Sequence, residues 1–249
     1  MALTEYEVWD RTQRIFHWIN ALAVLVLAGL GLVILSADAL GIPNDPGRIV
    51  LKTVHVYAGY VFALNLAWRL AWAFIGGAYS RWSALLPWGK GFGRGLVAFV
   101  SELRAGRFPA HLGHSPLARI VLSAIVLSLI AQAATGLVLA GTDVYMPPLG
   151  GYFAEQVAAG THDPALVRPY APDTVDAEAY AAMRAFRAPI VAVHEFTFFL
   201  LAALVAIHVA AAVVAELKGG TVISAMVTGR KIFDRTPIDV ADTTAQPPR

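Results

Sequence analysis

Four long apolar segments dominate this sequence and restrict what it can fold into. They cover residues 16–37, 53–75, 120–140 and 189–215. Each is at least as long as the roughly 20 residues that a helix needs to cross about 30 Å of hydrocarbon. A helix satisfies its backbone hydrogen bonds internally, and the alternating pattern of a membrane β-barrel is missing from the sequence. The sequence therefore predicts four transmembrane helices.

The charges between these segments predict how the chain is oriented in the membrane. Residues 77–116 carry five Lys or Arg and one Glu, a net charge of +4, whereas residues 142–188 have a net charge of −3. Because positive loops stay in the cytoplasm, we expect residues 77–116 and both termini inside and residues 142–188 outside. The predicted fold is an all-α integral membrane protein, a four-transmembrane-helix bundle with a long outer loop between its third and fourth helices.

Two further segments have recognisable patterns. In Gly91–Leu103, apolar residues recur at helical spacing, which predicts a short amphipathic helix on the inner surface; they are Leu96, Phe99, Val100 and Leu103. The last residues are polar and proline-containing, so we expect a disordered tail over 237–249. The transmembrane domain is then expected to cover residues 1–236.

Composition excludes several classes of site. The chain has 249 residues and no cysteine, which rules out disulfides, thiolate zinc sites, iron–sulfur clusters and covalent attachment of c-type haem. Its formal net charge of +2 gives no strong basic field, so we expect no nucleic-acid partner. All four methionines lie outside the apolar segments. A metal at membrane depth would therefore depend on His, Tyr or carboxylate ligands.

Histidines inside the apolar segments are the main candidates for chemistry, because ionisable groups are costly in a membrane and usually functional. Three of the seven histidines lie in loops: His111, His114 and His162. The other four fall into two pairs at matched depth. We call His17 and His208, expected near the cytoplasmic surface, the inner pair, and His55 and His194, expected near the opposite surface, the outer pair.

The spacing of His194 and His208 indicates what the pairs could hold. Residues 14 positions apart on a helix return to within about 40° of the same face, displaced by roughly 21 Å. Two imidazoles on one stripe need partners on facing helices, which His17 and His55 supply. Two imidazoles converging on a planar macrocycle would ligate one iron. The economical interpretation is two b-type haems, one in each pair. A single such histidine could instead serve helix packing.

Four other residues could contact the same cofactors. Arg69 is the lone charge of its segment and could pair with a haem propionate near the inner pair, or it could reach the interface beside its tryptophan neighbours. Lys52, three residues before His55, is the corresponding candidate at the outer pair. Gly31 and Gly59 could let a flat ligand approach the backbone, although small residues also serve helix packing.

Several stretches resemble the bacterial cytochrome b561 and Ni-Fe hydrogenase cytochrome b subunit family. The resemblance covers about residues 8–232 and rests on RTQRIFHWINA (11–21), KTVHVYAGYVF (52–62), NLAWRLAW (65–72), HEFTFFLLAALVAIHVAA (194–211) and ISAMVTGRK (223–231). It implies an inner-membrane, multi-pass cytochrome with two haem b groups, in which His17, His55, His194 and His208 are the axial ligands.

The resemblance also implies a function. Such a cytochrome carries electrons between the quinone pool and a redox partner on the periplasmic side, such as a hydrogenase or a c-type cytochrome. A stand-alone superoxide:quinone oxidoreductase is an alternative, which the negative charge of residues 142–188 mildly disfavours. A proton channel or transporter with a histidine relay is a remote alternative, because the apolar segments offer few polar residues for a continuous path.

Overall fold

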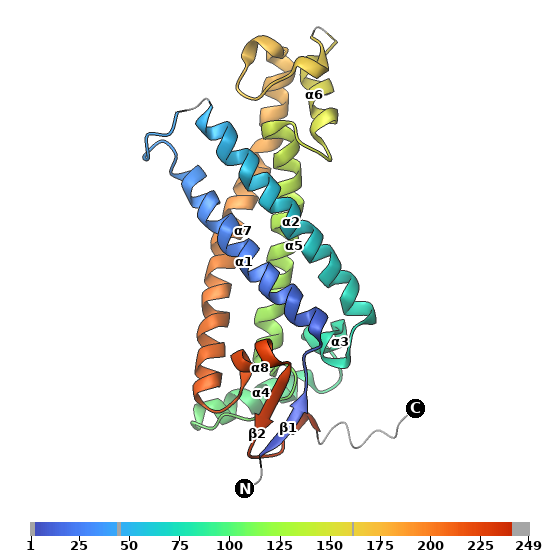
Figure 1. Cartoon of the computed structure of the whole chain (residues 1–249), viewed down its shortest axis with the longest axis vertical. Coiled ribbons are helices and arrows are strands. Elements are labelled where there is room, and N and C mark those ends of the chain that lie inside the picture. Colours follow the sequence, from blue (N-terminus) through green and yellow to red (C-terminus); the bar gives the residue numbers. More distant parts are fainter. Residues whose placement is uncertain (1–2, 44–45, 161, 241–249) are drawn as a thin grey trace. The chain divides into compact units, whose positions relative to one another are not determined.

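The structure is a computed structural model that describes residues 3–43, 46–160 and 162–240. Within these residues, four helices are long and apolar enough to cross a membrane: α1 (Arg11–Leu35), α2 (Gly47–Ile75), α5 (Pro116–Val144) and α7 (Ala177–Leu217) (Figure 1). The prediction of four spans is confirmed. Each helix extends beyond its apolar segment at one or both ends.

A capping residue sets the start of α1. The carboxylate of Asp10 accepts a hydrogen bond from the backbone N–H of Gln13 at 2.7 Å, which satisfies one of the free donors of the first helical turn. The same carboxylate accepts bonds from Ser80 Oγ at 2.8 Å and Trp72 Nε1 at 3.3 Å. Burial alone would raise the pKa of Asp10, but these hydrogen bonds outweigh it and hold that pKa below its usual value.

The fourth span begins earlier than the sequence predicts. The prediction began this span at Pro189, the first residue of its apolar segment. The structure places Pro189 inside α7. The carboxylate of Asp176 caps the true start by accepting backbone N–H bonds from Glu178 and Ala179 at 3.1 and 2.9 Å.

The chain forms two compact units, and each of the four long helices contributes one end to each unit. The first unit contains the described residues up to Trp18, Ala67–Leu127 and those from Leu201 onward. The second contains Ile19–Leu66 and Ser128–Leu200. The inner pair of histidines therefore belongs entirely to the first unit, and the outer pair belongs entirely to the second.

The first unit also holds several shorter elements outside the spans. They are η1 (Ala78–Ser80), α3 (Trp82–Leu85), α4 (Phe92–Arg104), α8 (Val222–Thr228) and a two-stranded antiparallel sheet of β1 (Thr4–Glu7) and β2 (Arg230–Phe233) (Figure 1). Helix α4 confirms the predicted amphipathic helix within one residue at each end. The sheet was not predicted, because each strand is only four residues long.

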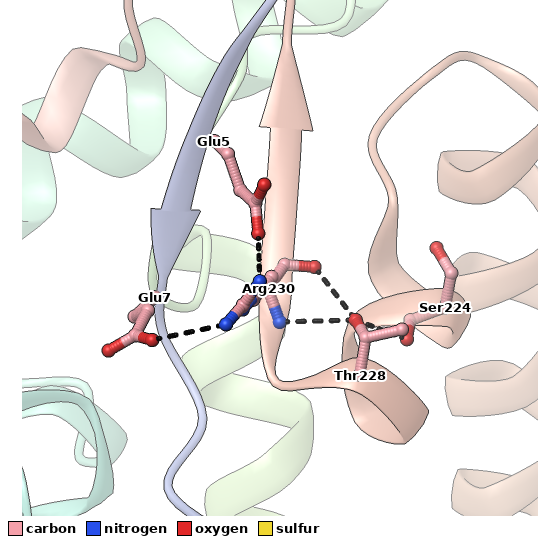
Figure 2. A network of polar contacts seen from close by, with 5 residues as sticks. All are labelled: Glu5, Glu7, Ser224, Thr228 and Arg230. Atoms are coloured by element: carbon pink, nitrogen blue, oxygen red, sulfur yellow. Dashed lines mark hydrogen bonds and ion pairs between the residues drawn. The ribbon is translucent and has the colours of Figure 1, made fainter.

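Ion pairs and a buried cation hold this sheet in place. Figure 2 shows Arg230 reaching across to β1, where its guanidinium lies 2.8 Å from Glu5 and 3.7 Å from Glu7. The next side chain, Lys231, is only 4% exposed and donates hydrogen bonds to the carbonyls of His111 and Gly113. The apolar core beside the sheet consists of Val8, Trp9, Ala110, Leu112, Ala225 and Phe233.

The first residues of the predicted tail belong to this folded unit. Pro237 is fully buried, and Asp239 accepts backbone hydrogen bonds from Leu112 and Gly113 at 2.7 and 2.8 Å. A disordered tail beginning at residue 237 is therefore wrong for residues 237–240. Residues 241–249 lie outside the described part of the chain.

The predicted long outer loop is largely folded and lies in the second unit. It contains α6 (Gly150–Ala158), η2 (Pro164–Leu166), η3 (Pro172–Thr174) and the first turns of α7 (Figure 1). Its apolar core is formed by Phe153, Val157, Val175 and Met183. This core gives the segment a fixed surface.

Candidate functional site

The outer pair brings two imidazoles from different helices close together. The ring centroids of His55 on α2 and His194 on α7 lie 6.5 Å apart, with their planes at 73°. Two imidazoles that share one metal from opposite sides place their centroids about 6–6.5 Å apart, given metal–nitrogen bonds of about 2.0–2.1 Å. The observed separation therefore fits two axial ligands of one iron.

Glycines leave room beside both rings of the outer pair. A β-carbon at Gly31 on α1 would lie 3.6 Å from Cε1 of His55, and one at Gly136 on α5 would lie 3.5 Å from Cε1 of His194. Gly31 is one of the glycines that the sequence pointed to, whereas Gly136 was not among the predicted site residues. A β-carbon at Gly59 would meet no atom within 4 Å, so open space adjoins α2 one turn after His55.

Two polar residues of α5 contact His194. Thr135 Oγ1 lies 2.8 Å from Nδ1 of the ring, and Gln132 Nε2 donates to the carbonyl of His194 at 2.8 Å. By contrast, Nδ1 of His55 is buried and has no hydrogen-bond partner among the described residues. Sequence reasoning missed both polar residues, although their spacing places them on one face of a largely apolar segment.

A cation precedes each histidine of the outer pair on its helix. Lys52 Nζ lies 2.7 Å from Asp143 and 2.6 Å from the hydroxyl of Tyr170. Arg187, two turns before His194 on α7, lies 2.9 Å from the other oxygen of Asp143. The sequence singled out Lys52 and missed Arg187, which fell in the predicted loop. One carboxylate thus joins two cations, and the cluster has a net positive charge.

The inner pair lies in the first unit. His17 on α1 and His208 on α7 are close enough for their charges to interact. The ring of His17 packs edge to face against Trp18 at 5.2 Å, and Trp18 Nε1 donates to the carbonyl of Met226 on α8 at 3.0 Å. Among the described residues, no partner reaches the buried Nδ1 of His17.

Arg69 is buried next to the inner pair. Its side chain is 5% exposed, and its guanidinium lies 5.7 Å from the ring of Phe16, the residue before His17. The buried Nη1 of Arg69 has no hydrogen-bond partner within the described ranges. A buried cation with a free donor fits an anionic group such as a carboxylate, and its burial disagrees with the interfacial alternative.

One of the loop histidines also lies in this region. The ring of His114 packs on Trp9 with centroids 4.9 Å apart, and its charge would interact with those of Arg69 and His208. Burial lowers the pKa of His114 to about 3, so the ring is neutral at physiological pH. The sequence gave no signal for this position, because it depends on the fold of the loop before α5.

The chemistry of the donor set fits a haem better than a bare ion. The described residues bring together no group of three or more His, Cys, Asp or Glu side chains that could hold an ion. What they bring together are pairs of histidines, and two axial ligands complete the coordination of an iron already held by a porphyrin.

Known proteins resemble this chain over most of its length. The model of the family described as prokaryotic cytochrome b561 matches residues 8–229. A "Probable Ni/Fe-hydrogenase B-type cytochrome subunit" of Cupriavidus necator is 26% identical, covering 91% of this chain and 86% of the relative. The protein of that name from Rhizobium leguminosarum bv. viciae is 25% identical, covering 91% and 88%. A corresponding hydrogenase 1 subunit of Escherichia coli is 29% identical, covering 55% and 61%. No solved structure matches the chain.

Proposed function

This chain belongs to the prokaryotic cytochrome b561 family of membrane electron-transport proteins, and from that premise we propose that it binds two haem b groups. His55 and His194 would hold one group, and His17 and His208 would hold the other. The 6.5 Å separation of the outer-pair rings is the observation that carries the proposal, because it suits two histidines that would hold one haem iron between them.

The side chains around each pair would bind and screen the cofactors. Arg69 would face a propionate at the inner haem, and Lys52 and Arg187 would balance the charge of the propionates at the outer haem. Bound haem would supply one-electron redox chemistry, and the protein would set the position, axial ligation and surrounding charge of each iron.

We infer that electrons move between quinone in the bilayer and a redox protein on the periplasmic side. The names of the relatives support a hydrogenase as that partner. The folded segment between α5 and α7 offers a fixed, acidic surface for docking, and a c-type cytochrome would suit the same surface. We place the protein in the bacterial inner membrane, as its family suggests, and the loop charges support an orientation with both termini in the cytoplasm.

Haem content tests the first part of this proposal. Protein purified in detergent should show the reduced-minus-oxidised spectrum of low-spin b-type haem, with two haems per chain in the pyridine haemochrome assay. Replacing His55 or His194 by Ala should remove one haem and leave the other. As a control, His162→Ala should keep both. A folded preparation without haem would rule the proposal out.

Electron flow needs a separate measurement. In proteoliposomes, a quinol should reduce both haems of the wild-type protein, and a purified Ni-Fe hydrogenase with hydrogen should reduce them from the side that carries α6. Loss of the outer haem in His194→Ala should block reduction by hydrogenase. If the haems equilibrate with neither reductant, the proposed route is wrong even though the haems are present.

A further inference from the structure

We propose that Thr135 is a positioning residue that fixes which nitrogen of His194 is available to iron. This inference rests on the proposed function, because it concerns how an axial ligand is held. Thr135 lies on α5, a helix that carries neither histidine pair. Its hydroxyl holds His194 as the tautomer with a proton on Nδ1, and this leaves the lone pair on Nε2 for the metal.

A count of protons assigns the direction of the hydrogen bond between the two side chains. A threonine hydroxyl has one proton to donate. Thr135 Oγ1 lies 2.6 Å from the carbonyl oxygen of Ala131, and two oxygens approach this closely only with a proton between them. The hydroxyl proton is therefore used on α5 itself. The contact of 2.8 Å between Oγ1 and Nδ1 of His194 must then be donated by an Nδ1–H group.

Neighbouring residues hold the same part of α7 by its backbone. Gln132 Nε2 donates to the carbonyl of His194 at 2.8 Å and to Thr197 Oγ1 at 3.0 Å. Thr197 in turn donates to the carbonyl of Val193 at 2.8 Å. One face of α5 carries Gln132, Thr135 and Gly136. These residues contact the backbone carbonyl of His194, contact its Nδ1, and leave space beside its Cε1, respectively.

The two ligands of the outer pair differ in this respect. Nδ1 of His55 has no hydrogen-bond partner among the described residues, whereas Nδ1 of His194 donates to Thr135. A hydrogen bond from the outer nitrogen makes an imidazole a more basic ligand. A more basic ligand favours ferric over ferrous iron. The Thr135 contact is therefore expected to lower the reduction potential of the outer haem.

Thr135→Val tests the inference, because it keeps the side-chain shape and removes the hydroxyl. We expect an upward shift of the reduction potential of the outer haem, a changed electron paramagnetic resonance signal of its ferric form, and no shift for the inner haem. Thr135→Ser should restore both wild-type values. Thr142→Val is the matched control, because Thr142 is buried on the same helix and its hydroxyl bonds only to the carbonyl of Val138 in the described structure.

The outcomes separate this inference from the proposed function. Two haems with unshifted potentials in Thr135→Val would overturn the inference alone, and so would a failure of Thr135→Ser to restore the signal. Wild-type protein that binds no haem would overturn the proposed function instead. If Thr135→Val does not fold, electron–nuclear double resonance on the ferric wild-type protein tests the hydrogen bond directly. A hydrogen-bonded, exchangeable imidazole proton at the outer haem supports the inference, and its absence contradicts it.

Discussion

Cε1 of His194 lies 3.5 Å from the place that a β-carbon would occupy at Gly136. The absence of a side chain at residue 136 therefore leaves space beside this imidazole. We predict that Gly136→Ala is tolerated, since a methyl group makes an ordinary contact there, whereas Gly136→Leu reduces the content of the outer haem from one per chain to a small fraction. Gly31→Leu should act in the same way on the His55 side. The pyridine haemochrome assay measures both effects.

Gly93→Leu is the control for these substitutions. Gly93 lies on α4, and a β-carbon there would meet no atom within 4 Å. Its haem content should remain at the wild-type value. Full occupancy in both leucine variants would show that the glycines do not border the cofactor.

The shared carboxylate of Asp143 predicts opposite shifts in reduction potential. A unit charge about 10 Å from a redox centre changes its energy by about 1–2 kcal/mol at an effective dielectric constant of about 20. Asp143→Asn removes a negative charge and should raise the potential of the outer haem, whereas Arg187→Gln should lower it. Spectroelectrochemical titration measures both. Asp38→Asn is the control, because it removes a different ion-paired carboxylate of the same unit. Its reduction potentials should equal those of the wild type.

Burial of Arg69 predicts selective damage to the inner haem. Arg69→Leu removes the buried cation, so the carboxylate that it would face loses its counter-charge. We expect the inner haem to be lost or weakly bound while the outer haem stays. Arg69→Lys should recover part of the loss, because it keeps the charge without the planar fork. Equal loss of both haems in Arg69→Leu would contradict a local role.

The buried side chain of Lys231 predicts that the free energy of unfolding increases at alkaline pH. Burial lowers its pKa to about 8, against an ordinary value of 10.5. Between these two values the unfolded chain binds the proton and the folded protein does not, so the free energy of unfolding rises with pH in that window. Below about pH 8 both states are protonated and the slope vanishes. Thermal unfolding in detergent from pH 7 to 10.5 measures it.

Lys231→Met should remove this slope, because methionine cannot titrate. Arg230→Gln is the matched control, since Arg230 is the adjacent and exposed residue of the same strand. It should keep the slope and lower stability by less than about 1 kcal/mol, as expected for exposed ion pairs. A slope of wild-type size in Lys231→Met would assign the effect to another group.

The spans and the histidine pairs could be predicted because both depend on patterns along single segments. Apolar length predicts a membrane helix, and helical spacing put His194 and His208 on one stripe. The start of α7 could not be predicted in this way, because Asp176 caps the helix upstream and Pro189 is accommodated inside it.

The supporting residues were harder to predict than the histidines. Thr135 and Arg187 matter through contacts with residues far away in the sequence, and such contacts depend on how the helices pack. The pairing of β1 with β2 joins segments from opposite ends of the chain. Strands this short carry little signal of their own, and their partner is what stabilises them.

The composition of the two units has a consequence for biosynthesis. Both units contain part of α7, which is the last of the four long helices to be synthesised. The first unit also contains β2, which lies still later in the chain. His17 is translated early, yet it has to wait for nearly the whole polypeptide before its companion on α7 exists. A cofactor that bound at either pair could therefore be held only after α7 has been made, and a nascent chain stalled before α7 would lack one histidine of each pair.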